Sequence, residues 1–282
     1  MNILILGSSG MLGNHISRTL SKDHHLLKPI KKSLNITNEE ILLNYFEANT
    51  IDLVINCSAY TNVPLAEEKT DEAFSVNAEG PKNLAKISKK FQVPLIHFST
   101  DYVFDGKKES YIEEDKMYPL NVYGESKKLG EHYIRENLDM HLIFRISWIY
   151  CKNNESFITK ILDRLGEKKD LEVVSDQIGS PTWCGSIASA IQKILYEIDL
   201  KNFQSWGTYH LSNSGNTSWF NFANEIALVW KKKTEIKSIY SSQLPLNIKR
   251  PKRSVLKNDK FKDTFGFSLD HWKVALRECK AS

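Results

Sequence analysis

Short apolar runs alternate with longer amphipathic stretches through the first half of the chain. A short apolar run bounded by polar or glycine residues is typical of a buried strand, and apolar positions three or four residues apart are typical of a helix. The pattern predicts strands at 2–6, 26–27, 53–57, 95–99 and 142–145. It predicts helices at 13–20, 38–48, 70–91 and from the segment around Tyr123 to about 137.

This alternation of strands and helices predicts the fold class. Parallel strands need long crossover connections, which are usually helices, and parallel sheets are therefore covered on both faces. We expect an α/β protein with a doubly wound parallel sheet of the Rossmann type.

Beyond about residue 149 the alternation becomes less regular. Here we expect helices at 157–165, 185–198 and 218–231, the last with Ser218 as its N-cap, together with strands at 171–174 and 207–211 and a loop at 244–253. We expect residues 1–150 to form the Rossmann core, with parts of 183–215 returning to it. Residues 151–282 then form mainly a smaller C-terminal α/β lobe that binds substrate.

The composition narrows the class of protein. With 282 residues, 41% hydrophobic and 26% charged, the chain suits one large domain or a domain with a smaller lobe. Its net charge of +4 does not indicate a nucleic-acid partner. No apolar run approaches the roughly 20 residues of a membrane span, and the N-terminus lacks the pattern of a signal peptide. The four cysteines lie far apart and the eight histidines show no metal-ligand spacing, so we expect a cytoplasmic protein without a catalytic metal.

A glycine-rich loop, Gly7-Ser8-Ser9-Gly10-Met11-Leu12-Gly13, follows the first predicted strand and leads into a helix. Glycines at this spacing allow a tight turn, a close approach of the backbone to a pyrophosphate and close packing of helix on strand. The helix N-terminus adds N–H donors and a partial positive charge. The loop predicts a dinucleotide site, and the alternative is a tight turn without a ligand.

The residues that follow the second predicted strand bear on which dinucleotide binds. An acidic residue there accepts from the ribose 2′-hydroxyl of NAD, whereas basic residues pair with the 2′-phosphate of NADP. The chain has Lys28, Lys31 and Lys32 and no acidic residue before Glu39. The pattern favours NADP(H) and leaves NAD(H) as an alternative, unless these lysines belong only to a solvated loop.

Tyr123 and Lys127 are four residues apart and therefore lie on one face of a helix. Thr100 and Ser99 end an earlier strand, at the sheet edge where ligands of open α/β folds bind. One of these hydroxyls can polarise a carbonyl while Tyr123 delivers a proton. The Lys127 ammonium and the positive nicotinamide ring are expected to lower the Tyr123 pKa from about 10. The pattern predicts nicotinamide-dependent redox chemistry. His97, inside an apolar strand, is predicted to be a core histidine rather than a catalytic one.

Taken together, these motifs resemble the extended short-chain dehydrogenase/reductase superfamily and, within it, the dTDP-4-dehydrorhamnose reductase family. The resemblance extends through nearly the whole chain. It is carried by the segments Gly7–Gly13, Asn56–Thr61, Asn77–Gly80, Ser99–Gly106, Pro119–Gly124 with Lys127, Arg145–Tyr150, Asp176–Thr182, and Arg250-Pro251 with Ser254 and Leu256.

The resemblance implies hydride transfer from NAD(P)H to the C4 ketone of a nucleotide-linked 4-keto-6-deoxy sugar, as in dTDP-L-rhamnose and polysaccharide biosynthesis. It implies that Tyr123 donates the proton, that Lys127 modulates Tyr123 and holds the ribose, and that Thr100 polarises the ketone. Cofactor contacts are implied for Gly7, Ser9, Gly10, Met11, Leu12, Gly13, Lys31, Asn35, Ile36, Ser58 and Ala59. Substrate contacts are implied for Thr61, Val63, Asp101, Trp148 and Gln177, with the loop from Gln177 to Thr182 as part of the substrate wall.

The implied partner is a nucleotide-diphosphate sugar, and a homodimer is compatible with the resemblance. Three departures from the family pattern leave the identity of the sugar open. Residues 63–67 are Val-Pro-Leu-Ala-Glu where Val-Asp-Lys-Ala-Glu is common. Asn35 stands where an aspartate is common, and His15 stands at a position that is often acidic.

Two alternative functions remain. An epimerase or epimerase/reductase would need a further acid/base pair, and no Cys/Lys or Cys/His pair stands out at 61–69 or 102–106. A non-catalytic regulatory subunit, like that of methionine adenosyltransferase, is disfavoured because Thr100, Tyr123 and Lys127 are all present.

Overall fold

The computed structural model describes the chain except residues 153–154, 167–170, 201, 233–234 and 245–247. Its centre is a six-stranded parallel sheet of order β10-β5-β4-β3-β1-β2. The strands are β1 (Asn2–Leu6), β2 (His25–Leu27), β3 (Leu53–Asn56), β4 (Leu95–Thr100), β5 (His141–Ile146) and β10 (Gly207–His210). The predicted doubly wound parallel sheet is therefore confirmed.

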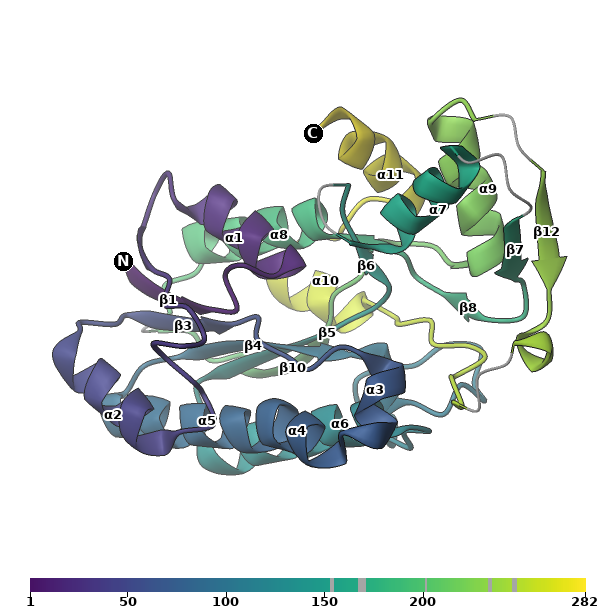
Figure 1. Cartoon of the computed structure of the whole chain (residues 1–282). Coiled ribbons are helices and arrows are strands. Elements are labelled where there is room, and N and C mark those ends of the chain that lie inside the picture. The colour runs from purple at the N-terminus through teal and green to yellow at the C-terminus, as the bar shows by residue number, and fades with distance from the viewer. Residues whose placement is uncertain (153–154, 167–170, 201, 233–234, 245–247) are drawn as a thin grey trace.

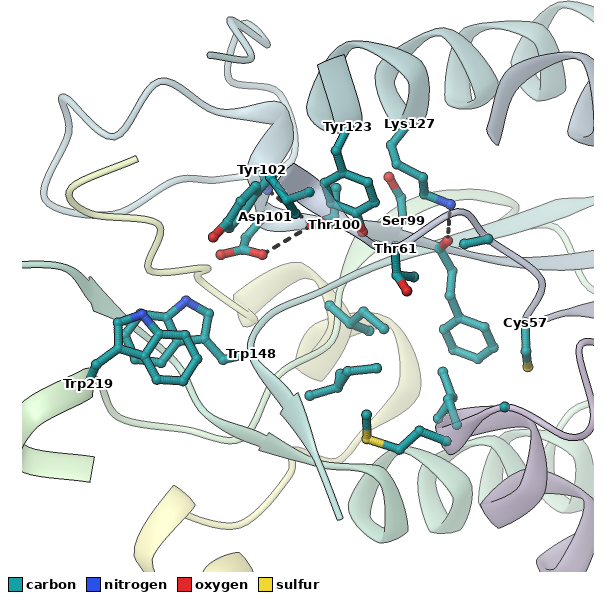
Figure 2. Close-up of a pocket in the computed structure, with 18 residues that line it drawn as sticks. Cys57, Thr61, Ser99, Thr100, Asp101, Tyr102, Tyr123, Lys127, Trp148 and Trp219 are labelled. Carbon is teal, nitrogen blue, oxygen red and sulfur yellow. Dashed lines mark hydrogen bonds between the residues drawn. The ribbon is translucent and has the colours of Figure 1, made fainter. Parts of the chain in front are cut away.

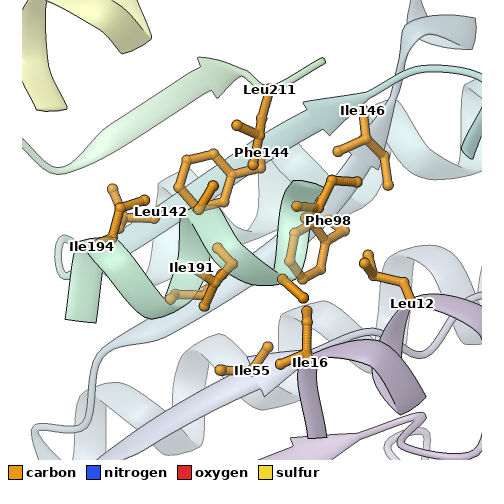
Figure 3. Close-up of a cluster of buried hydrophobic side chains, with 14 of the residues drawn as sticks. Leu12, Ile16, Ile55, Phe98, Leu142, Phe144, Ile146, Ile191, Ile194 and Leu211 are labelled. Atoms are coloured by element: carbon orange, nitrogen blue, oxygen red, sulfur yellow. The ribbon is translucent and has the colours of Figure 1, made fainter. Parts of the chain in front are cut away.

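Helices cover both faces of the sheet (Figure 1). On one face lie α1 (Met11–Leu20) and α8 (Cys184–Glu197), and on the other lie α2 (Glu39–Ala48), α5 (Gly80–Phe91) and α6 (Val122–Asn137). Successive side chains of a strand point to opposite faces of the sheet, so each strand contributes side chains to two hydrophobic cores. Within β1, Ile3 and Ile5 join the cluster under α1 and α8, whereas Leu4 and Leu6 join the cluster under α2 and α5. Figure 3 shows the first cluster, where Leu12 and Ile16 of α1 meet side chains of the sheet and of α8.

The predicted helix at 70–91 is present as three consecutive pieces. They are α4 (Thr70–Phe74), a π-helical turn (Ser75–Glu79) and α5. Asn77 lies in the π-helical turn and is 1% exposed. Its amide donates to the backbone oxygen of Tyr60 and to the hydroxyl of Ser126, and its oxygen accepts from the backbone N–H of Tyr60. Such turns are frequent at functional sites, and this one connects the loop after β3 to α6.

A short helix, α3 (Val63–Glu68), was not predicted. The side chain of Asn62 caps it by accepting from the backbone N–H of Leu65, and Pro64 occupies its first turn. Both features favour helix initiation. Residues 63–67, which depart from the common family pattern, therefore form most of a helix. Glu67 links this helix to the start of α6, because its carboxylate accepts a hydrogen bond from the backbone N–H of Val122.

The second half of the chain builds a smaller lobe beside the sheet (Figure 1). It contains α7 (Phe157–Gly166), β7 (Leu171–Val174), α9 (Trp219–Val229), β12 (Ile236–Ile239) and α11 (Trp272–Ala281). β7 and β12 pair in parallel, and the second of these strands was not predicted. The predicted N-cap of α9 is confirmed, because the Ser218 hydroxyl accepts from the backbone N–H of Asn221. The predicted loop at 244–253 lies partly outside the described residues, at 245–247, and its described part contains no helix or named strand.

Several segments from the second half return to the main sheet. α8 packs on α1, β10 extends the sheet beside β5, and α10 (Asp259–Phe265) inserts Phe261 and Phe265 into the larger core. Four short strands connect lobe and core: β6 (Ile149–Tyr150), β8 (Ile178–Gly179), β9 (Thr182–Trp183) and β11 (Thr217–Ser218). In the described part of the chain, no helix has the length and apolarity that crossing a membrane requires.

Candidate active site

A cavity of about 440 Å³ lies where the carboxyl ends of β3 and β4 meet α6 and the smaller lobe. Figure 2 shows Tyr123 and Lys127 projecting from one helix towards Thr100, Ser99 and Thr61, with Trp148 on the opposite side from Cys57. The lining residues are Gly10, Met11, Leu12, Cys57, Ala59, Thr61, Val63, Phe98, Ser99, Thr100, Asp101, Tyr102, Tyr123, Lys127, Ile146, Trp148, Ile149 and Trp219.

The start of α6 positions Tyr123. The side chain of Asn121 caps the helix by accepting from the backbone N–H of Gly124 at 2.9 Å. A Cβ on Gly124 would lie 2.3 Å from the backbone oxygen of Tyr102, so glycine allows α6 to pack directly on the segment after β4. This close contact places the Tyr123 hydroxyl next to that of Thr100.

Burial raises the pKa of Tyr123, and the hydrogen bond with Thr100 opposes the rise without cancelling it. In this structure Lys127 does not lower the Tyr123 pKa, whereas the expected effect of the nicotinamide ring stays a prediction. The reason is geometric: the Lys127 Nζ lies 2.7 Å from the backbone oxygen of Phe98, to which it donates, and 3.1 Å from the Nε2 of His97. A raised pKa keeps the phenol protonated, which is the state that a proton donor needs.

Lys127 is itself 1% exposed. Burial lowers its pKa to about 8, and the nearby Glu131 and Cys57 oppose this change. An amine with such a pKa is close to its titration range at neutral pH, unlike a surface lysine.

Thr100 and Asp101 form a second polar group at the end of β4. The Thr100 hydroxyl accepts from the backbone N–H of Tyr102 and donates to Asp101 Oδ1, both at 3.2 Å. The other carboxylate oxygen of Asp101 accepts from the Ser147 hydroxyl at 3.2 Å. Burial raises the pKa of Asp101 to about 6, although hydrogen bonds from Ser254, Ser147 and Thr100 oppose the rise. These contacts fix the orientation of the Thr100 hydroxyl.

Trp148 forms the far wall of the cavity in a strained backbone conformation, with a φ of 46°. A non-glycine residue in this region is uncommon and often marks a functional position. Its ring is stacked on Trp219, with centroids 3.5 Å apart and planes inclined by 5° (Figure 2). Behind it, a Cβ on Gly179 would lie 2.4 Å from the ring. The predicted wall loop thus supports Trp148 from behind, and none of its residues from Gln177 to Thr182 lines this cavity.

A second cavity, of about 290 Å³, lies beside the glycine-rich loop. Its lining residues are Leu6, Gly7, Ser8, Ser9, Gly10, Pro29, Ile30, Lys31, Leu34, Asn35, Ile36, Cys57, Ser58, Ala59, Tyr60 and Val76. It shares Gly10, Cys57 and Ala59 with the first cavity, so the two adjoin. Together they accommodate an elongated ligand that reaches from the second strand to Tyr123.

The glycine-rich loop fits a pyrophosphate. Gly7 has a φ of 70°, and a Cβ on it would lie 2.7 Å from the backbone nitrogen of Ser58. A Cβ on Gly13 would lie 2.2 Å from the backbone oxygen of Gly7, so α1 packs against the loop only with glycine there. At Gly10, the N-cap of α1, no side chain caps the helix. Uncapped N–H groups at a helix N-terminus form an anion-binding site.

Most residues proposed for the cofactor line one of the two cavities, whereas Gly13 and two of the three lysines line neither. Among the lysines after β2, only Lys31 lines the second cavity, whereas Lys28 and Lys32 do not. Gln177, which was proposed for the substrate, lines a third cavity with Asp176, Tyr240 and Arg250. Gly13 acts through packing rather than as a lining residue.

Sequence patterns missed several lining residues. Trp219 follows an N-cap serine, and no local pattern connects it to Trp148, so only the structure shows the stacked pair. Cys57 lies inside the motif Asn56–Thr61 and follows a strand, which is a signal that could have identified it. In the part of the chain that the structure describes, no group of three His, Cys, Asp or Glu side chains is arranged to hold a metal ion.

The parallel sheet, the glycine-rich loop before α1 and the Tyr-x-x-x-Lys pair on α6 define the chain as a short-chain dehydrogenase/reductase of the extended type. The family model described as "RmlD substrate binding domain" matches residues 1–282. The chain is 35% identical to a dTDP-4-dehydrorhamnose reductase of Burkholderia thailandensis, over 99% of this chain and 98% of that protein. It belongs to the dTDP-4-dehydrorhamnose reductase family, which confirms the predicted resemblance.

Comparison with solved structures supports the same family assignment. A dTDP-4-dehydrorhamnose reductase of Clostridium acetobutylicum superposes with a TM-score of 0.94 at 33% identity, covering 100% of this chain and 99% of that one. The enzyme of the same name from Bacillus anthracis, crystallised in complex with NADP, also gives a TM-score of 0.94, at 31% identity, and covers 99% of this chain and 98% of that one.

Proposed function

We propose that the protein uses NADPH to reduce the C4 ketone of a nucleotide-linked 4-keto-6-deoxy sugar, with dTDP-4-dehydrorhamnose as the substrate. The observation that carries the proposal is the neighbouring hydroxyls of Tyr123 and Thr100, which line a cavity that adjoins the glycine-loop cavity. The names of its relatives support the choice of sugar, and the NADP-bound Bacillus anthracis structure supports the choice of cofactor. In this proposal the Rossmann core binds the cofactor and the smaller lobe binds the sugar nucleotide.

Each residue then has a distinct role. When bound, the nicotinamide cofactor supplies the hydride. Tyr123 donates its hydroxyl proton to the ketone oxygen. Thr100 turns its hydroxyl proton from Asp101 to the same oxygen and donates a hydrogen bond that stabilises the negative charge that develops there. Lys127 hydrogen-bonds the ribose and, when protonated, stabilises the tyrosinate that forms. Trp148 and Val63 border the sugar and exclude water.

The alternatives receive less support. Among the described residues that line the Tyr123 cavity, the ionisable side chains are Cys57, Asp101, Tyr102, Tyr123 and Lys127, and no histidine is present. Burial raises the pKa of the Cys57 thiol, which keeps it protonated and makes it a poor base for epimerisation. A non-catalytic role would leave the buried Tyr123–Thr100 pair without a purpose.

The direct test is consumption of NADPH, followed by absorbance, with enzymatically prepared dTDP-4-keto-6-deoxy sugars. We expect turnover with dTDP-4-dehydrorhamnose and a rhamnose-configured product by chromatography and NMR. If NADPH binds but no such sugar is reduced, the proposed function is wrong.

We expect Lys31 to set the preference between the two cofactors. Because Lys31 lines the second cavity and can pair with a 2′-phosphate, Lys31→Glu should lower the ratio of NADPH to NADH kcat/KM by about tenfold or more. Lys32→Glu makes the same charge change at an exposed position that does not line the cavity and should leave the ratio within about twofold. Equal effects of the two substitutions would show that net charge, rather than this contact, sets the preference.

We expect Lys127→Ala to lower kcat and to weaken NADPH binding together, each by about tenfold or more, because one side chain serves both proton transfer and the ribose. Lys128→Ala is the matched control. It removes the next lysine of α6, which is 38% exposed and faces Glu125, and should leave both quantities unchanged. Wild-type NADPH affinity in Lys127→Ala, measured by calorimetry, would remove the ribose role.

A further inference from the structure

Three buried polar side chains form a chain of contacts beneath the active site. Asn56 ends β3, His97 lies within β4, and Lys127 lies on α6. Their exposed fractions are 1%, 0% and 1%. Asn56 Nδ2 lies 3.1 Å from His97 Nδ1, and His97 Nε2 lies 3.1 Å from Lys127 Nζ. Neither Asn56 nor His97 lines the two cavities, and neither has a role in the proposed reaction.

The backbone fixes the orientation of the Asn56 amide. The N–H of Ser58 lies 3.0 Å from Asn56 Oδ1, and a backbone N–H can only donate. The Ser58 hydroxyl donates to the same oxygen. The oxygen of the Asn56 amide therefore faces Ser58, and its NH₂ group faces His97.

This orientation determines the tautomer of His97. Because the Asn56 NH₂ group donates, His97 Nδ1 must accept, and a neutral imidazole with an accepting Nδ1 carries its proton on Nε2. Burial lowers the His97 pKa well below 6.5, so the ring is neutral. The Nε2–H then points at Lys127 Nζ. A neutral amine has a lone pair that accepts this hydrogen bond, whereas an ammonium has only donors.

We propose that His97 is a positioning residue for Lys127: Asn56 holds its imidazole in the Nε2–H tautomer, and the Nε2–H group donates to the neutral amine of Lys127. His97 thereby favours the uncharged state of the lysine in the resting protein. Protonation of Lys127 would require the His97 ring to change tautomer. It would also require the Asn56 amide to rotate and to lose its two hydrogen bonds with Ser58, which lines the second cavity.

Few other charged or titratable groups surround the side chains of Asn56, His97 and Lys127. Glu131 and Cys57 favour the charged form of Lys127, and Tyr123 lies one turn before it. Glu131 also acts to raise the His97 pKa, whereas His141 acts to lower it. The Glu131 carboxylate is already paired with Arg145 and Arg135, which weakens its influence on Lys127. Burial lowers the Lys127 pKa to about 8, and the proposed contact acts in the same direction as burial.

The tautomer can be observed in the wild-type protein without substrate. Long-range ¹H–¹⁵N correlation spectra distinguish the two neutral tautomers and the imidazolium, and loss of one pattern in His97→Gln assigns the signal. We expect the Nε2–H pattern for His97 at neutral pH. An Nδ1–H pattern or an imidazolium would overturn the proposal, whatever reaction the protein catalyses.

A second measurement tests the effect on Lys127, and it alone rests on the proposed function. His97→Gln places an amide oxygen where Nε2–H stood, so it offers the ammonium an acceptor without adding charge. Asn56→Asp accepts from both Ser58 and His97 Nδ1–H, which turns Nε2 into an acceptor. Each change favours the ammonium form of Lys127. The alkaline limb of the kcat/KM profile should therefore move to higher pH by about one unit or more in both variants. At a pH above the limb, this shift is a tenfold gain in the fraction of Lys127 that is protonated.

His141→Gln is the matched control, because it removes a buried histidine of the neighbouring strand that contacts the backbone oxygen of Leu138 rather than Lys127. Its alkaline limb should stay at the wild-type position. An unshifted limb in both His97→Gln and Asn56→Asp would overturn the effect on Lys127. Absence of turnover in the wild-type protein would instead refute the proposed function and leave the spectroscopic result to decide the tautomer.

Discussion

Replacing Tyr123 with phenylalanine lowers kcat by about 10²- to 10⁴-fold, the range expected when a positioned general acid is removed. The substitution removes the one hydroxyl that is both hydrogen-bonded to Thr100 and held in its protonated form by burial. The ring remains, so its edge-to-face contact with Tyr102 is preserved and the cavity keeps its shape. The Kd of NADPH should therefore stay within about twofold of the wild-type value.

Tyr133→Phe provides the control for this loss. Tyr133 lies on the same helix, is half-buried, and contacts Lys82 rather than the cavity. Its kcat should match that of the wild type in stopped-flow and steady-state assays of NADPH consumption. If Tyr123→Phe turned over as fast as Tyr133→Phe, the proton would have to come from another group, and Tyr123 would lose its proposed role.

Replacing Glu131 with glutamine should lower the free energy of unfolding by about 3–5 kcal/mol, because removing one partner of a buried ion pair leaves the other charge uncompensated. Glu131 is fully buried and accepts from Arg145 through both carboxylate oxygens, at 2.8 and 3.0 Å. It also accepts from Arg135 at 2.9 Å and from the Ser99 hydroxyl. A protein of this kind has a total stability of about 5–15 kcal/mol, so the loss is a large fraction. Urea titration followed by circular dichroism measures it.

The pH dependence of stability gives an independent check. Although burial acts in the opposite direction, Arg145, Arg135 and Ser99 together lower the Glu131 pKa to about 2. Since the folded pKa lies below the unfolded value, this carboxylate stabilises the protein above about pH 4.5 and progressively less as the pH falls towards 2. Glu131→Gln should flatten the profile over that window.

Glu136→Gln is the matched substitution on the same helix, at a side chain that is 64% exposed. It should change the free energy of unfolding by no more than about 0.5 kcal/mol. Equal stability of the Glu131 and Glu136 variants would show that the buried pair contributes nothing net to the folded state.

The outer framework of the site was predictable from local patterns. The glycine-rich loop and the Tyr123–Lys127 pair each occupy consecutive turns of chain, and both follow from spacing alone. The apolar runs that predicted β1, β3, β4 and β5 are continuous because both faces of a parallel sheet are covered. α3 escaped prediction because a helix of six residues leaves too short a periodic pattern.

Other features of the site depend on segments that meet only in the folded chain. The stacking of Trp148 on Trp219, the position of Gln177 in a separate cavity and the selection of Lys31 among three lysines have no local signal. The effect of Lys127 on the Tyr123 pKa was predicted wrongly for the same reason. Sequence spacing showed that Lys127 shares a helix face with Tyr123, but not that its amine points to Phe98 and His97.

By itself, the sequence determined the fold class and predicted the glycine-rich loop and the Tyr123–Lys127 pair as site elements, because periodicity and spacing within one segment suffice to find them. The tertiary structure decided how those groups titrate and what surrounds them. Burial and hydrogen bonding act across strands that are distant in sequence, as between Asn56, His97 and Lys127, where the backbone N–H of Ser58 sets the tautomer of a histidine one strand away. Such effects depend on three-dimensional distance and solvent exclusion, which a linear pattern of residues does not contain.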